Sequence, residues 1–285
     1  MKNKTCGNQL LGSTVKTASV TLLLALSGAS AFAAATASDT AANYAGTWST
    51  TPANLGTGFG AWSVSDNNSG SGPYAGTYLD QTSYGNSDGV LSGGYAWGTY
   101  ANGGSGNGYF DMTRSFLAGA SGSASLYNQT FSIAMGTSGV GGAGSAVGVD
   151  IGTAFSIGYI AGGGDNMSLS VDGGAESAVP VTYAQVNSGL LISLAVSGAL
   201  NSTSENYTLT LSPFAGGAAY DTITGTFDSL DYNTASFTMF DDNTSNDGFY
   251  NNPTITAETP VPEPSTLALM TLSGLATLRV IRRRK

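Results

Sequence analysis

Hydrophobic and polar residues alternate strictly along the middle of the chain. Apolar side chains occupy every second position in seven runs, at residues 131–135, 147–151, 155–159, 167–171, 190–196, 207–211 and 237–239. A period of two residues is typical of strands with one buried face. Ser and Thr fill many of the alternate positions, as in an antiparallel sheet with one face in water.

Short turn-forming segments of Gly, or of Asp followed by Gly, separate many of these runs. They lie at residues 88–89, 93–94, 103–104, 162–164, 172–174, 216–217 and 247–248. Short strands divided in this way predict an all-β antiparallel sandwich or jelly roll. No window between Ala34 and Pro260 has a helical period, and no tandem repeat or internal linker divides the region. We therefore expect one domain at residues 43–258, after a short leader at 34–42.

The N-terminus has the pattern of a secretory signal peptide. Lys2, Lys4 and Lys16 precede or flank a short apolar run at residues 20–26, and small residues follow at the spacing that signal peptidase needs. We expect cleavage after Ala33, which would remove residues 1–33. The single cysteine of the chain lies in that segment, so the exported protein would have no disulfide or thiol chemistry.

The C-terminal segment, residues 259–285, combines a proline-rich start, an apolar run and a basic end. The apolar run at 265–278 is short, because a helix that spans a bilayer needs about 20 residues. The basic end would stay in the cytoplasm by the positive-inside rule. We expect a hydrophobic helix that acts as a marginal membrane anchor through Leu267, Leu269, Leu272, Leu275 and Leu278.

The order of Pro262-Glu263-Pro264, hydrophobic helix and terminal arginines resembles the PEP-CTERM sorting tail of Gram-negative bacteria. The resemblance implies that an exosortase, an integral-membrane cysteine peptidase, recognises Pro262, Glu263 and Pro264 and that the protein reaches the cell exterior. Proteins with this tail are associated with exopolysaccharide production and biofilm matrix. The expected partners are therefore signal peptidase, exosortase and extracellular polysaccharide, and the helix would hold the chain at the inner membrane, transiently or permanently.

Acidic residues dominate the predicted domain. All of the chain's 18 Asp and Glu except Glu263 lie between Ala34 and Pro260, where Arg114 is the only Lys or Arg. Such a charge balance repels phosphate backbones and argues against nucleic-acid binding. The sequence contains no His, which excludes Ser-His-Asp and Cys-His catalysis and any imidazole metal ligand.

A second resemblance covers most of the predicted domain. Its motifs, at residues 59–62, 97–104, 114–116, 147–150 and 241–252, are similar to those of PEP-CTERM ectodomains that look like concanavalin A-like lectin/glucanase sandwiches. The resemblance implies a jelly roll of two large antiparallel sheets and no particular activity. Retaining glucanases of this fold use a Glu-x-Asp-x-Glu strand for their two carboxylates, and none of the chain's four Glu lies in that pattern.

A cluster of oxygen-bearing side chains is a candidate calcium site. Asp241, Asp242, Asn243 and Asp247 offer the carboxylate and amide oxygens that Ca²⁺ prefers. The favoured alternative is an ordinary turn, because Asp and Asn cap their own backbone and tolerate left-handed conformations. Calcium is the only cofactor that the sequence suggests, and none is required.

Aromatic residues are candidates for a sugar-stacking surface. Trp62, Trp97 and Tyr100 lie in the aromatic-rich first part of the domain, although large aromatics of β-sandwiches usually pack in the core. Arg114 is expected to pair with a neighbouring acid, and the alternative is that it binds the carboxylate of an anionic glycan.

These features together predict an exported, non-catalytic surface or matrix protein that binds or structures extracellular polysaccharide. One alternative is a glycan hydrolase that uses Asp carboxylates, which two carboxylates facing each other in a cleft would favour. The other is a purely structural or adhesive surface protein, which an even Ser/Thr surface would favour.

Overall fold

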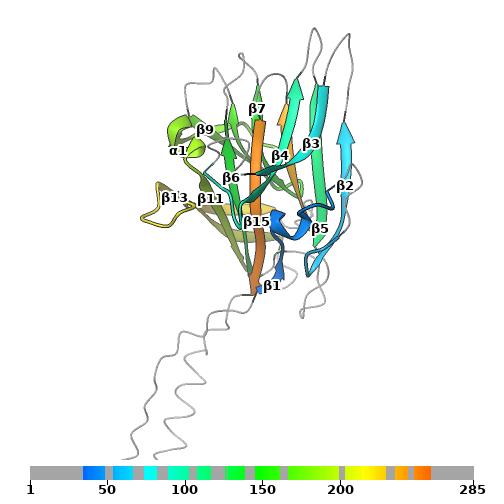
Figure 1. Ribbon diagram of the computed structural model, residues 1–285. Helices are drawn as coiled ribbons and strands as arrows, with labels where there is room; N and C mark the ends of the chain where they lie inside the picture. The colour runs from blue at the N-terminus through cyan, green and yellow to red at the C-terminus, as the bar shows by residue number, and fades with distance from the viewer. Residues whose placement is uncertain are drawn as a thin grey trace, which may run out of the picture. The chain divides into compact units, whose positions relative to one another are not determined.

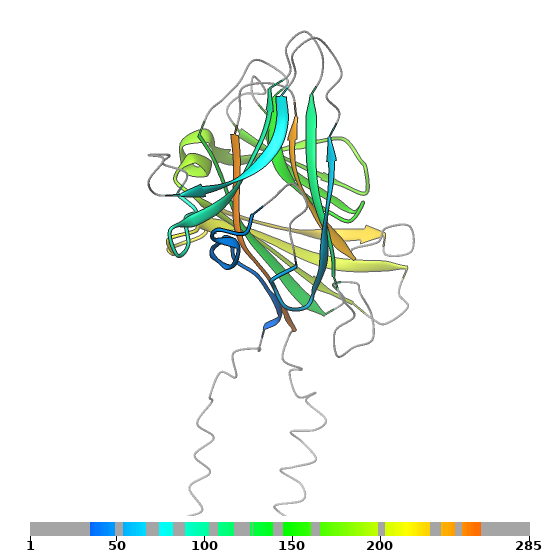
Figure 2. The same ribbon diagram turned by 45° about the vertical axis from the view of Figure 1, so that its right-hand side comes forward.

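The computed structural model describes residues 35–48, 54–66, 74–81, 89–102, 108–116, 126, 128–138, 145–160, 166–198, 203–228, 235–242 and 247–257. The strands in these segments form two antiparallel sheets that pack face to face (Figures 1 and 2). The predicted all-β antiparallel sandwich is therefore confirmed. The predicted signal peptide and the predicted C-terminal helix lie outside the described residues.

Sheet A is the larger of the two and contains eight strands. Seven of them follow one another in space in the order β13 (Asp221–Asp228), β12 (Ser204–Pro213), β11 (Leu190–Ser197), β6 (Gln129–Thr137), β15 (Asp247–Ala257), β4 (Tyr95–Asn102) and β3 (Tyr74–Gln81). The eighth, β1 (Ala35–Ser38), pairs with the second half of β15, whose first half pairs with β4. In Figure 1, β15 (orange) accordingly lies beside β1 (blue).

Sheet B contains seven strands. Their order in space is β10 (Ser177–Thr182), β9 (Asn166–Val171), β8 (Phe155–Ile160), β7 (Ala146–Ile151), β14 (Ser236–Asp242), β5 (Tyr109–Phe116) and β2 (Phe59–Asp66). Between β9 and β10, Asp172 and Gly173 both have positive φ angles, of 56° and 61°. An Asp-Gly pair suits this turn because both residues tolerate the left-handed conformation.

The core lies between the sheets and is built by the apolar half of each alternating pattern. In β6, Phe131, Ile133 and Met135 are fully buried, and in β14 Phe237 and Met239 are fully buried and face them from the other sheet. Each such side chain contributes about 1.5–3 kcal/mol on burial. Every one of the seven apolar runs in the sequence lies in a strand of sheet A or sheet B.

Two helical turns differ from the prediction of a domain without helix. They are the 3₁₀ turn η1 (Ala41–Tyr44) and α1 (Tyr183–Asn187). A capping box begins α1, in which the main-chain N–H of Thr182 donates to Oε1 of Gln185 at 2.7 Å. Helices of one turn are too short to carry an apolar period, which is why the periodicity missed them.

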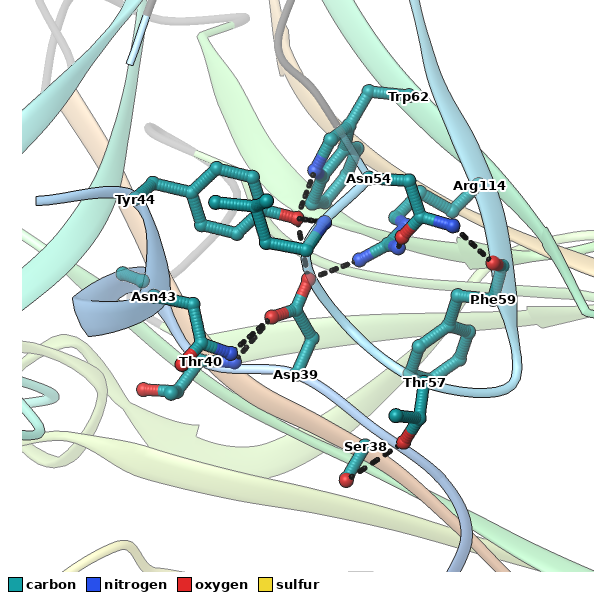
Figure 3. A network of polar contacts seen from close by, with 12 residues as sticks. Ser38, Asp39, Thr40, Asn43, Tyr44, Asn54, Thr57, Phe59, Trp62 and Arg114 are labelled. Carbon is teal, nitrogen blue, oxygen red and sulfur yellow. Dashed lines mark hydrogen bonds and ion pairs between the residues drawn. The ribbon is translucent and has the colours of Figure 1, made fainter. Parts of the chain in front are cut away.

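The domain begins ahead of the predicted boundary at Asn43. Strand β1 is part of sheet A, and the buried Asp39 that follows it forms an ion pair with Arg114 of β5 (Figure 3). The Tyr44 hydroxyl also donates to Asp39, at 2.6 Å. Residues 35–42 are thus built into the sandwich and are not a separate leader.

Candidate functional site

A hollow of about 420 Å³ lies on the outer face of sheet B. It crosses the middle of the sheet, where β14 lies between β7 and β5. The alternation of β14 turns Phe240 and Asp242 outward into the hollow, whereas Asp241 between them is buried. Asp111 of β5 and Asp150 of β7 line the hollow on either side of β14.

The ring of Phe240 lies over two glycines. Phe240 pairs with Gly148 of β7, and Gly148 pairs with Gly158 of β8. A Cβ atom on Gly148 would overlap with the Phe240 ring, and a Cβ atom on Gly158 would come within 3.0 Å of it. The two missing side chains therefore let the aromatic ring lie against the sheet, where it remains partly exposed.

We expect Gly148→Ala to displace this ring. The added methyl group would also meet the carbonyl oxygen of Ile157 at 2.5 Å, so the backbone of two strands would have to shift. Overpacking of this kind costs about 1–3 kcal/mol, measurable as a lower midpoint in urea unfolding. Gly158→Ala is the matched control, because its nearest contacts, at 3.0 Å and 3.1 Å, are milder. If the two variants lower the urea midpoint equally, the fit at Gly148 is no tighter than the fit at Gly158, which would contradict the prediction.

Tyr250 supports the floor of the hollow from the other sheet. This fully buried side chain of β15 reaches β7 and β14, where its hydroxyl lies 3.0 Å from the Gly148 carbonyl and 2.8 Å from the Phe240 carbonyl. The hydroxyl also accepts a hydrogen bond from the Gly148 N–H, at 3.2 Å. Burial raises the pKa of Tyr250 well above its ordinary value, so the phenol remains a neutral donor.

The carboxylates of the hollow are partly withdrawn from water and repel one another. Burial, together with the charges of Asp242 and Asp150, raises the pKa of Asp111 to about 6. Burial also raises the pKa of Asp242, and it raises the pKa of Asp150, to which the charge of Asp242 adds. Oδ1 of Asp150 is buried and has no hydrogen-bond partner among the described residues.

The predicted calcium ligands do not converge in the described part of the chain. Asp242 faces the hollow, Asp241 is buried between the sheets, and Asp247 of β15 accepts a hydrogen bond from the Tyr78 hydroxyl at 3.3 Å. Asn243 lies outside the described residues. Within those residues no group of three or more His, Cys, Asp or Glu side chains is placed to hold a metal ion.

The predicted aromatic candidates do not form one exposed surface either. Trp97 is fully buried and Trp62 is 7% exposed, and their rings meet edge to face in the core. Tyr100 is partly exposed and lies against Tyr78 on sheet A. Both tryptophans therefore lie in the core, as large aromatic residues of β-sandwiches usually do.

Arg114 is fully buried at the centre of a polar network between the sheets (Figure 3). Its guanidinium forms the ion pair with Asp39, donates to the side-chain oxygen of Asn54, and donates through Nε to the Gly60 carbonyl at 3.0 Å. It also lies 4.7 Å from the centroid of the Trp62 ring. The sequence left two alternatives for Arg114, a pairing with a neighbouring acid or contact with the carboxylate of a glycan. In the structure, Arg114 pairs with an acid, Asp39.

Sequence reasoning missed Phe240, Asp111 and Asp150. A signal was present, because Phe240 is a large aromatic at a position of β14 where the alternation expects a polar side chain. Gly148 and Gly158 occupy the equivalent outward positions of their strands. Which strands become neighbours is not encoded in the alternation, so the sequence did not bring these residues together.

A row of hydroxyl groups crosses the outer face of sheet A. Cross-strand pairing places one row of small side chains side by side over five strands: Thr222, Thr210, Ser193, Ser132 and Thr254. The Ser132 hydroxyl donates to that of Ser193 at 3.0 Å. Elsewhere on the same face, Ala96, Ala134 and Phe249 form a small apolar cluster, so the Ser/Thr row covers only part of the face.

Comparison with known proteins identifies the C-terminal segment. Residues 260–285 match the PEP-CTERM protein-sorting motif, which indicates an exported, exosortase-sorted surface protein. No curated protein matches the chain. None of the helices in the described segments is long and apolar enough to cross a membrane, and the predicted anchor leucines lie outside those segments.

Three solved structures with similar folds have low sequence identity. The binding domain of botulinum neurotoxin DC in complex with SialylT is 12% identical, with a TM-score of 0.38 over 70% of this chain and 47% of that one. The globular domain of T. cruzi calreticulin is 8% identical, with a TM-score of 0.36 over 74% and 92%. Peanut lectin with a 9mer peptide is 10% identical, with a TM-score of 0.31 over 69% and 99%. The chain thus spans less than half the length of the neurotoxin binding domain.

Proposed function

We propose that this exported protein binds extracellular polysaccharide in the hollow of sheet B and that it does not catalyse a reaction. The observation that carries the proposal is the partly exposed Phe240 ring, which lies over Gly148 and Gly158 inside a hollow lined by carboxylates. The sorting motif supports the proposal because it directs the protein to the outside of the cell.

The chemistry of the hollow suits a sugar. The apolar face of a pyranose ring packs on an aromatic ring, and its hydroxyl groups donate hydrogen bonds to carboxylates. Phe240 supplies the aromatic surface, Asp111 and Asp242 supply acceptors, and Ser156 adds a hydroxyl group. A volume of about 420 Å³ is within the range of small-molecule sites, so one or two sugar units of a longer chain would fit.

The hydrolase alternative lacks the carboxylate pattern of retaining glucanases of this fold. Those enzymes use a Glu-x-Asp-x-Glu strand, and none of the chain's four Glu lies in that pattern. The raised pKa values of Asp111, Asp150 and Asp242 suit binding and acid catalysis alike, so the test of hydrolysis is the release of shortened glycans.

A structural role is the second candidate function, and the row of hydroxyl groups on sheet A favours it. The row of hydroxyl groups from Thr222 to Thr254 would suit contact with a flat matrix polymer. In that case substitutions on sheet A, and not in the hollow, would reduce retention of the protein in the matrix.

Phe240→Ala is expected to weaken glycan binding and leave the fold intact. The partly exposed ring contributes stacking to the ligand, whereas the β14 core contacts come from Phe237 and Met239 on the other face. The measurement is a glycan array with the purified protein, in calcium and again in EDTA, checked by circular dichroism. Phe214→Ala is the control, since this partly buried Phe lies outside the hollow.

The outcomes of the array are distinct. Weaker binding in the Phe240 variant, but not in the Phe214 variant, supports the hollow as the glycan site. Loss of binding in EDTA would instead support a calcium-dependent site in the acidic segment at Asp241 and Asp247. Release of shortened glycans would favour the hydrolase. Absence of binding to every glycan would reject the proposal in favour of the structural role.

A further inference from the structure

We propose that the polysaccharide bound in the hollow carries protonated amines, as a deacetylated amino-sugar polymer does. This inference rests on the proposed function and names the class of sugar that the same site prefers. It starts from the charges that meet around the Phe240 ring, together with the shape of the hollow.

Four acidic side chains from different parts of sheet B line the hollow. Asp111 comes from β5, Asp150 from β7, Asp242 from β14, and Glu176 precedes β10. None of the described lining residues is a cation, and the only Arg among the described residues, Arg114, is buried against Asp39 between the sheets. A neutral sugar would leave these charges uncompensated, and an anionic sugar would be repelled.

The carboxylates are arranged around the aromatic ring and not at a single point. Asp111 is the direct cross-strand partner of Phe240, and Asp242 lies two residues farther along β14 on the same face. Asp150 lies two residues beyond Gly148, which is the partner of Phe240 on the other side. A sugar that stacks on Phe240 therefore presents the substituents of its ring edge to carboxylates on both sides.

An ammonium group on the ring edge matches this arrangement. It has three hydrogen-bond donors and a positive charge, and charge-assisted hydrogen bonds to carboxylates are about twice as strong as neutral ones. A bare divalent cation fits less well, because it needs several carboxylates that converge on one point. The described residues place no group of three acidic side chains in that way.

Binding of an amine would also displace protons from the hollow. In the free protein, burial and the charges of Asp242 and Asp150 raise the pKa of Asp111 to about 6. A nearby ammonium favours the ionised carboxylate and lowers that pKa. Uptake of an aminated sugar near pH 6 should therefore release protons, and uptake of a neutral sugar should not.

The test compares three tetrasaccharides with the same β-1,4 linkage. A glucosamine tetramer, an N-acetylglucosamine tetramer and cellotetraose differ only in the substituent at carbon 2, which is an amine, an acetamide or a hydroxyl. Titration calorimetry with the purified full-length protein at pH 6 and low salt should give about tenfold tighter binding of the glucosamine tetramer. Repetition in buffers with different ionisation enthalpies should reveal proton release for that ligand alone.

Variants separate the charge contribution from the stacking contribution. Asp111→Asn and Asp242→Asn should reduce the preference for the amine and leave binding of cellotetraose unchanged. Phe240→Ala should weaken binding of all three ligands. Asp221→Asn is the matched control, because it removes the same charge from sheet A, outside the hollow.

Two results would overturn the inference in distinguishable ways. If cellotetraose or the acetylated tetramer binds as tightly as the glucosamine tetramer, or if only neutral glycans of the array bind, the hollow is a glycan site without preference for amines. If no glycan binds, or if binding of each ligand is unaffected by Phe240→Ala, the proposed function of the hollow fails as well.

Discussion

Replacement of Arg114 with methionine is expected to lower the free energy of unfolding by about 3–5 kcal/mol. The methionine side chain has a similar length and would fill much of the space. It would leave the carboxylate of Asp39 buried without its ion-pair partner, and it would remove the donors to Asn54 and to the Gly60 carbonyl. An unpaired buried charge is among the most destabilising changes in a folded protein.

The ion pair matters because it joins distant segments of the chain. Asp39 follows β1 of sheet A, and Arg114 belongs to β5 of sheet B. Asp39 also accepts hydrogen bonds from the main-chain N–H of Thr40 and from Nδ2 of Asn43, at 2.8 Å and 2.9 Å. The network therefore fixes the N-terminal segment against the opposite sheet (Figure 3).

Urea unfolding at pH 7 measures the effect. Arg114→Lys is the informative control, because it keeps the charge but lacks the planar fork that reaches three partners. We expect a loss smaller than that of Arg114→Met. The double variant Arg114→Met with Asp39→Asn should lose less than the sum of the two single variants, because both remove the same interaction. A loss below about 1 kcal/mol for Arg114→Met would contradict a structural role of the pair.

The same network predicts where the domain must begin. A chain that starts at Asn43 lacks β1 and Asp39, whereas a chain that starts at Ala34 retains both. We expect the chain that starts at Asn43 to lose at least as much free energy of unfolding as the Arg114→Met variant.

The second large expected effect is a fall in the free energy of unfolding as the pH rises from mildly acidic to weakly basic values. Asp241 is fully buried, and this burial raises its pKa to about 8 from an ordinary value of 3.8. Its Oδ2 accepts hydrogen bonds from the Gly248 N–H at 3.3 Å and from the Thr99 hydroxyl at 3.4 Å, which offset only part of the cost of burial. Oδ1 has no partner among the described residues.

The direction of the effect follows from proton linkage. Between about pH 4 and pH 8 the folded protein keeps a proton on Asp241 that the unfolded chain has released, so unfolding becomes easier as the pH rises. The contribution is fully present below the pKa of the unfolded chain and is lost as the pH rises through that window. From pH 4 to pH 7 the change is on the order of 4 kcal/mol, since each pKa unit corresponds to about 1.4 kcal/mol.

Asp241→Asn tests this prediction. The amide has the size of the protonated acid and carries no charge at any pH, so the variant should be more stable than the parent protein above pH 7 and should vary less with pH. The measurement is a series of urea unfolding curves from pH 4 to pH 8. Asp66→Asn, which removes an exposed carboxylate, should leave the pH dependence in place. A variant that is less stable than the parent at pH 8 would refute the assignment.

The alternation of apolar residues was enough to predict the sandwich and most of its inward-facing side chains. The runs that contain Phe131, Val149, Ile192 and Leu209 all became strands with these residues buried, because a period of two can bury only one face of a strand. The sorting tail was likewise recognised from local order alone, since the motif is contiguous in the sequence.

The candidate site was not predictable in the same way. Asp241, Asp242 and Asp247 are close in sequence, and the sequence therefore grouped them. The pleat of β14 separates the first two onto opposite faces, and β15 places the third in the other sheet. Conversely, Asp111, Asp150 and Phe240 are far apart in sequence and meet only because β5, β14 and β7 are neighbours.

The sequence by itself determined the strand pattern, the exported character and the excess of acidic charge, since each depends on residue type and local order. Only the tertiary structure decided which acids are buried, which aromatic ring remains exposed, and that the one cation of the domain is used in the core. These properties depend on strand order and on the face to which each residue points, and many strand orders are compatible with the same alternation.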